Sequence, residues 1–125
     1  KVERLNNKMR KEKQPLKKQE LLEEYKPEEV IIEEPFAKVN LHVFEVLCEF
    51  FGMVLYVCHE RNIKTTTYTA AVWRSVLGLK GKNRKEQKEN AINYVKDAFQ
   101  IECTDDEAEA ILIGYSHIKR EQNSE

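Results

Sequence analysis

The chain has 125 residues, of which 41% are hydrophobic and 34% are charged, and its formal net charge is −1. This length fits one domain over residues 1–125, and the composition is that of a soluble globular protein. No run of eighteen uncharged apolar residues exists, which argues against a membrane-spanning protein. The chain starts with a polar, basic segment and lacks an initiator methionine, so we expect a cytoplasmic protein of which this is a fragment.

Charge is distributed unevenly along the chain. Residues 1–18 contain eight basic and two acidic residues, and residues 74–88 contain six basic residues and one acidic residue. Residues 97–109 instead contain six acidic residues and no basic one. Basic segments beside an acidic segment suit a protein that binds phosphates and concentrates a divalent metal ion. Solvated helix faces would give the same pattern, so composition leaves both interpretations open.

Two short strands are predicted after an amphipathic helical region at the N-terminus. Val30–Glu33 has three aliphatic residues before a glutamate, which indicates a buried strand with a carboxylate at its C-terminal end. Residues 63–68, "IKTTTY", are rich in β-branched side chains. A long helical connection between the two makes a parallel pair. Because two parallel strands do not make a stable open sheet, we expect N-terminal strands that are missing from this chain.

The connection between these strands is predicted to be a long apolar helix. It is capped by Asn40, runs from residue 41 to about residue 60, and is apolar on most of its circumference. A helix of this kind is buried on more than one side. We expect one face to cover the sheet and another to form a homodimer interface. The predicted interface residues are Phe44, Leu47, Phe51 and Leu55.

Three helices are predicted in the C-terminal half. Thr69 begins a short helix that Gly78 ends, and a basic loop leads to a helix over residues 85–99. "TDDE" at Thr104–Glu107 is a capping box that opens a last helix, running to about residue 121. The order of helices and strands predicts an α/β fold. The three cysteines lack the CxxC spacing of a zinc site and are interpreted as reduced core thiols.

Three carboxylates stand out as candidate metal ligands. Glu33 leaves the C-terminal end of a parallel strand, where α/β folds place their ligand sites. Asp106 and Glu109 are three residues apart at the start of a helix and share one of its faces. Such oxygen ligands favour Mg²⁺ or Mn²⁺, which drive phosphoryl transfer. The alternatives are a helix cap that needs no metal and a solvated loop after the strand.

The order and spacing of several short motifs resemble a known family. "LLEEYKPEEVIIEEPF" precedes the apolar helix, and "TTTYTAAVWRSVLGLKGKNRKEQKENAINYVKDAF" and "DDEAEAILIGYSH" follow it. Over residues 16–121 this arrangement is similar to the RuvC-type Holliday-junction resolvases, with the phage-encoded branch as the nearest likeness. The resemblance implies a ribonuclease-H-like fold, a homodimer, and acidic residues that hold a divalent metal.

By position, Glu33 resembles the family's glutamate after the fourth strand, and Asp106 and Glu109 resemble the acidic pair of the last helix. The family usually has aspartate at the second of these positions, so Glu109 is a longer-armed departure. Asp105 could substitute as a metal ligand or act only as a cap residue. The family's first aspartate, on an N-terminal strand, has no match in this chain.

The basic loop resembles the family's substrate-facing segment, and its alternative interpretation is a mobile surface loop. The expected phosphate contacts are Arg74, Lys80, Lys82, Arg84 and Lys85. The resemblance implies a metal-dependent endodeoxyribonuclease that cuts branched DNA such as Holliday junctions, although this chain alone could be inactive. The alternative is an inactive, dimeric DNA-binding or protein-binding module. A bacterial cytoplasmic protein, possibly encoded by a phage, fits both.

Overall fold

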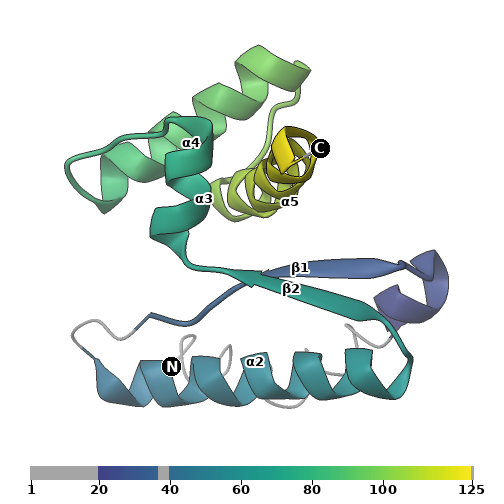
Figure 1. The fold of residues 1–125 in the computed structure, drawn as a ribbon. Helices are drawn as coiled ribbons and strands as arrows, with labels where there is room; N and C mark the ends of the chain where they lie inside the picture. The colour runs from purple at the N-terminus through teal and green to yellow at the C-terminus, as the bar shows by residue number, and fades with distance from the viewer. Residues whose placement is uncertain (1–19, 37–39, 125) are drawn as a thin grey trace. The chain divides into compact units, whose positions relative to one another are not determined.

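The computed structural model describes residues 20–36 and 40–124, and the order of elements is that of an α/β protein (Figure 1). A short helical segment at residues 20–25 precedes the first strand. The elements that follow are β1 (Glu29–Glu33), α2 (Leu41–Glu60), β2 (Lys64–Tyr68), α3 (Ala70–Leu77), α4 (Arg84–Phe99) and α5 (Asp105–Ser124). The elements predicted from residue 30 onward therefore all form, with ends that differ by a few residues, whereas most of the predicted N-terminal helical region lies outside the described residues.

The sheet of the described residues consists of β1 and β2 side by side. Helix α2 carries the chain back between them, so the two strands run in the same direction (Figure 1). At their start, the backbone N–H of Lys64 donates a hydrogen bond to the carbonyl of Glu28 at 3.2 Å. The parallel pairing is confirmed, and Glu33 ends β1 as expected. Further N-terminal strands stay a prediction, because residues 1–19 lie outside the described residues.

The chain divides into two compact units, and each strand contributes residues to both. The first unit is Lys1–Val30 with Glu34–Thr66, and the second is Ile31–Glu33 with Thr67–Glu125. The single domain over residues 1–125 stays a prediction.

Helix α2 is the long helix of the first unit. The Asn40 side chain caps it by accepting hydrogen bonds from the backbone N–H groups of His42 and Val43, at 3.0 and 3.2 Å. Cys58 is its one fully buried side chain. Five other large apolar side chains of the helix are exposed, spread over much of its circumference, and we call this set the α2 apolar face. It comprises Leu41, Val43, Leu47, Met53 and Tyr56.

The four predicted interface residues share one face of the helix but differ in exposure. Leu47 is 46% exposed, whereas Phe44, Phe51 and Leu55 are half-buried within the chain. Cys48 is exposed, so its interpretation as a core thiol was wrong. The interface over these four residues stays a prediction.

By length and composition, α2 could also cross a membrane. It has 20 residues and a mean hydropathy of 1.8, and in the described part of the chain it alone reaches such values. A core or interface helix meets the same criterion, so the finding is weak evidence. The helix also carries three glutamates, and two of them, Glu45 and Glu49, lie away from its ends, where they would be costly in a lipid bilayer.

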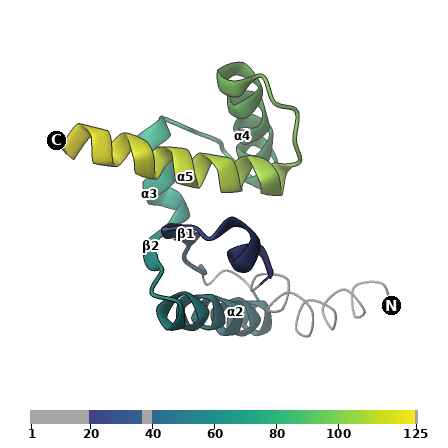
Figure 2. The same ribbon diagram turned by 90° about the vertical axis from the view of Figure 1, so that its right-hand side faces the viewer.

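The hydrophobic core lies in the second unit, where α5 packs against α3 and α4 (Figure 2). Trp73 from α3, Val95 from α4 and Leu112 from α5 are fully buried. Ala91 and Ala108 are also fully buried, and their small side chains allow α4 and α5 to approach closely. This core fixes the start of α5 next to α3 and α4.

Local signals in the sequence set the ends of these helices. Thr69 Oγ1 accepts from the N–H of Val72 at 3.3 Å, and Gly78 ends α3 with a left-handed φ of 68°. The capping box is confirmed, because Thr104 and Glu107 each accept a hydrogen bond from the other's backbone N–H, both at 3.2 Å. Gly81 is needed for packing, since a Cβ there would lie 2.9 Å from the backbone nitrogen of Gln87.

Candidate active site

Glu33 lies at the end of β1, beside the first turns of α3. Its Oε2 accepts a hydrogen bond from the indole Nε1–H of the buried Trp73 at 3.3 Å. The residue is exposed overall, but burial of its carboxyl group raises its pKa above the usual value. The Trp73 hydrogen bond lowers the pKa, the negative charge of Glu109 raises it, and the positive charges of Arg74 and Arg84 lower it. Glu33 is therefore within electrostatic reach of Glu109.

The start of α5 brings three carboxylates together. Asp105, Asp106 and Glu109 each offer an oxygen, and these atoms lie within 4.8 Å of one another. We call these three residues the acidic group. Lys88 from α4 pairs with Asp105 at 3.2 Å, and its hydrogen bond and charge lower the pKa of that carboxyl. Glu33 is not among the residues of this group.

Glu109 is the most enclosed member of the acidic group. Its side chain is 11% exposed, and both of its carboxylate oxygens accept hydrogen bonds from arginines. Arg84 binds it with both terminal nitrogens, at 2.7 Å to Oε1 and 3.3 Å to Oε2. Arg74 donates to Oε2 at 3.0 Å. Two guanidinium groups thus surround one buried carboxylate, which is the pairing that a buried charge requires.

These two arginines differ in how firmly they are held. The side chain of Arg74 is 12% exposed, and its guanidinium lies 4.7 Å from the centre of the Trp73 ring. The side chain of Arg84 is 44% exposed and comes from the first residue of α4, next to the basic loop. Sequence reasoning placed both among the phosphate contacts, and it missed their pairing with Glu109.

The donor set suits a hard divalent cation. Carboxylate oxygens are the ligands that Mg²⁺ and Mn²⁺ prefer, and the acidic group offers three carboxylates within a small space. Asp105, Asp106 and Glu109 would hold such an ion. The carboxyl group of Glu33 is close enough to interact electrostatically with Glu109. A cation bound directly by Glu109 would stand beside the two guanidinium groups that this carboxylate already pairs with. Whether Glu33 shares the ion stays a prediction.

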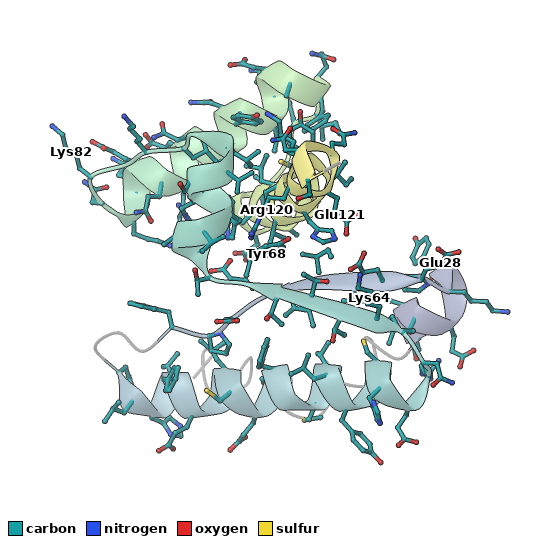
Figure 3. The ribbon with its side chains drawn as sticks, viewed as in Figure 1. Glu28, Lys64, Tyr68, Lys82, Arg120 and Glu121 are labelled. Carbon is teal, nitrogen blue, oxygen red and sulfur yellow. The ribbon has the colours of Figure 1, made fainter. Side chains whose placement is uncertain are left out.

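The basic loop between α3 and α4 extends the site with positive charge. Lys80, Lys82 and Lys85 are exposed, and Figure 3 shows the Lys82 side chain reaching outward from this loop. A cavity of about 490 Å³ lies beside the loop. Its lining residues are Ala71, Arg74, Ser75, Gly78, Leu79, Lys80, Gly81 and Gln87. Lysines on an open loop beside a hollow are placed to meet phosphates.

A second polar contact of the core involves β2 and α5. The Tyr68 hydroxyl forms a hydrogen bond of 2.5 Å with Nδ1 of His117, and both residues are buried. Arg120 lies over the Tyr68 ring at 5.3 Å, and the two are seen together with Glu121 in Figure 3. His117 Nε2 is 3.2 Å from a carboxylate oxygen of Glu121. His117 is therefore held in the core through both of its ring nitrogens.

Comparison with known proteins connects this site to a family. The family model described as crossover junction endodeoxyribonuclease RuvC matches residues 1–117. Three curated relatives carry the name crossover junction endodeoxyribonuclease RuvC. One, from Dehalococcoides mccartyi, is 26% identical over 98 residues, which cover 78% of this chain and 59% of the relative.

The other two are similarly distant. The protein from Thermomicrobium roseum is 25% identical over 80% of this chain and 61% of its own length. The protein from Fusobacterium nucleatum is 29% identical over 78% of this chain and 52% of its own length. The chain thus spans between half and two thirds of the length of these relatives. No solved structure gives a significant match. Since the family model covers nearly the whole chain, the chain belongs to the RuvC crossover junction endodeoxyribonuclease family.

Proposed function

We propose that the protein containing this chain is a metal-dependent, structure-selective endodeoxyribonuclease that cuts branched DNA such as Holliday junctions. The observation that carries the proposal is the acidic group at the start of α5, next to the basic loop, in a chain of the RuvC family. A metal-dependent nuclease needs basic side chains and carboxylates close together. The basic residues bind the DNA backbone, and the carboxylates hold the metal ion.

The roles of the residues follow from their positions. Asp105, Asp106 and Glu109 would hold Mg²⁺ or Mn²⁺ together with Glu33, and such an ion would supply a more acidic water and positive charge for the phosphate. Lys80, Lys82 and Lys85 position the DNA backbone. Hydrolysis leaves a 5′-phosphate, as the family resemblance implies. The fold is of the ribonuclease-H-like type.

The proposed assembly is a homodimer in the bacterial cytoplasm. The α2 apolar face supports it, because five large apolar side chains on one helix are left exposed. The proposed interface residues are Phe44, Leu47, Phe51 and Leu55, which recur on one face of the helix, with Leu47 the most exposed of them. A phage-encoded origin stays part of the proposal, on the sequence resemblance alone.

A second candidate function is supported by the environment of Glu109. Two arginines already neutralise this carboxylate, as they would in a protein that no longer binds metal there. Such a protein would bind branched DNA as a dimer without cutting it.

Cleavage of a four-way DNA junction separates the two candidates. We expect cleavage in Mg²⁺ or Mn²⁺ and none in EDTA. Glu33→Gln should abolish cleavage and keep junction binding, since it removes a charged ligand at nearly constant shape. The matched control is Glu89→Gln, an exposed glutamate of α4 outside the acidic group, which should cut at the wild-type rate. Junction binding without cleavage in any metal ion would favour the inactive module.

A further inference from the structure

The inference concerns Arg84, which contacts the acidic group and also borders the basic loop. We propose that Arg84 is an exchangeable counter-ion: it holds Glu109 in the DNA-free protein and turns to a DNA phosphate when a metal ion binds the acidic group. The metal and DNA sites are thereby coupled through one side chain. This inference rests on the proposed function and adds a positioning residue to it.

The first step of the argument is that Glu109 cannot keep all its present partners and bind a cation. Its two oxygens accept three hydrogen bonds from guanidinium groups, at 2.7, 3.0 and 3.3 Å. A divalent ion at Glu109 would also stand close to both arginine charges. Repulsion between like charges at such distances is large where solvent is excluded, as it is around this side chain. At least one arginine must therefore withdraw.

The second step identifies Arg84 as the residue that leaves. Arg74 is 12% exposed and lies against the Trp73 ring, so moving it would disturb the core. Arg84 is 44% exposed, and its backbone is at the first residue of α4, where the N-terminal cap Asn83 joins the basic loop. Its side chain can swing from Glu109 into solvent without disturbing a buried contact of α4.

The third step gives the destination of the Arg84 side chain. Lys82 and Lys85 flank it in the sequence and are exposed, so DNA on this loop would place phosphates within reach of a freed guanidinium. A guanidinium binds a phosphate through the same two-pronged geometry that Arg84 uses with Glu109. DNA therefore compensates for the contact that the metal ion breaks. By linkage, DNA raises the metal affinity by the factor by which metal raises the DNA affinity.

Terbium luminescence tests the coupling without catalytic turnover as the readout. Tb³⁺ prefers oxygen ligands, and energy transfer from Trp73, the single tryptophan of the chain, reports ions near this site. Because DNA bases also sensitise Tb³⁺, the signal of the junction without protein is subtracted. Competition with Mg²⁺ shows that the Tb³⁺ site is the magnesium site. The dissociation constant is measured for the protein alone and for the protein saturated with a four-way junction.

We expect the junction to tighten Tb³⁺ binding to the wild type by at least about fivefold, the lower end of typical coupling between sites. Arg84→Gln should bind Tb³⁺ several-fold more tightly than the wild type without DNA, and should gain little from DNA. Arg84→Lys keeps the charge without the two-pronged geometry and should lie between them. Lys82→Gln is the control: it removes a loop charge that does not contact Glu109, so it should weaken junction binding yet keep the gain.

Two results would overturn the inference. One is unchanged Tb³⁺ affinity of Arg84→Gln in the absence of DNA, and the other is a full DNA-induced gain in that variant. In either case the proposed nuclease function stands if the wild type binds Mg²⁺ and cuts junctions. If the wild type binds neither Tb³⁺ nor Mg²⁺ near Trp73, both the metal-dependent function and this inference are wrong.

Discussion

Helices α2 and α5 have the same length, 20 residues each, and they use their side chains in opposite ways. Helix α2 is the more apolar, yet Cys58 is its one buried residue. Helix α5 is rich in polar and charged residues, yet six of its side chains are buried, including Glu109, Ser116 and His117. Apolar composition therefore does not identify the core helix here. In this chain the polar helix organises the core and the site, and the apolar helix is left with an exposed face.

The reason lies in what each helix packs against. Helix α5 contacts both α3 and α4, and its buried polar groups all have partners there or nearby. Glu109 is paired with two arginines, and His117 with Tyr68. Partnered polar groups can be buried at little net cost, whereas unpartnered ones cannot. Helix α2 needs no polar partner, but a second apolar surface is required to cover its outer face.

The largest expected effect tests whether α5 is the core helix. Leu112→Ala should lower the free energy of unfolding by about 3 kcal/mol, because it leaves a cavity at a fully buried position. Met53→Ala, on the α2 apolar face, should change it by about 0.5 kcal/mol or less when the protein is dilute. Urea denaturation followed by circular dichroism measures both. Equal losses from the two substitutions in dilute protein would contradict the contrast between the helices.

The next effect tests what covers the α2 apolar face. Leu47→Lys should weaken self-association by more than about tenfold, since it places a charge where two apolar faces would meet. Sedimentation equilibrium at micromolar concentration measures the change. Val72→Lys, at an exposed apolar position of α3, is the control and should leave the association unchanged. A wild-type protein that sediments as a monomer would remove the homodimer from the proposal.

The smallest effect uses one glycine within each helix. An added Cβ at Gly52 in α2 or at Gly114 in α5 meets no atom within 4 Å. Each glycine-to-alanine substitution should therefore raise the free energy of unfolding by about 0.5–1 kcal/mol, because alanine loses less backbone entropy in a helix. Thermal unfolding at low and high protein concentration measures both variants. If Gly52→Ala is stabilising only in dilute protein, a partner helix packs closely at that position.

Much of the fold could be predicted from local signals in the sequence, such as the residues that begin and end helices. Asn40, Thr69 and Thr104 each begin a helix through a side-chain hydrogen bond within three residues, and Gly78 ends one. The parallel pairing of β1 and β2 followed from the long helical connection between them. The acidic group was predicted in part for the same reason, since its three members lie within one turn and a half of a single helix.

The partners of the site residues were decided by the tertiary structure alone. Glu33 meets Trp73 across 40 residues of sequence, Glu109 meets Arg74 across 35, and Tyr68 meets His117 across 49. No periodicity links such pairs, because their distance depends on how α3, α4 and α5 pack and on which rotamers that packing allows. The sequence by itself determined which helices and strands form and which carboxylates share a helix face. Only the packing of α5 against α3 and α4 decided that Arg74 and Arg84 reach Glu109, since a buried carboxylate needs cationic partners and these two side chains lie close enough.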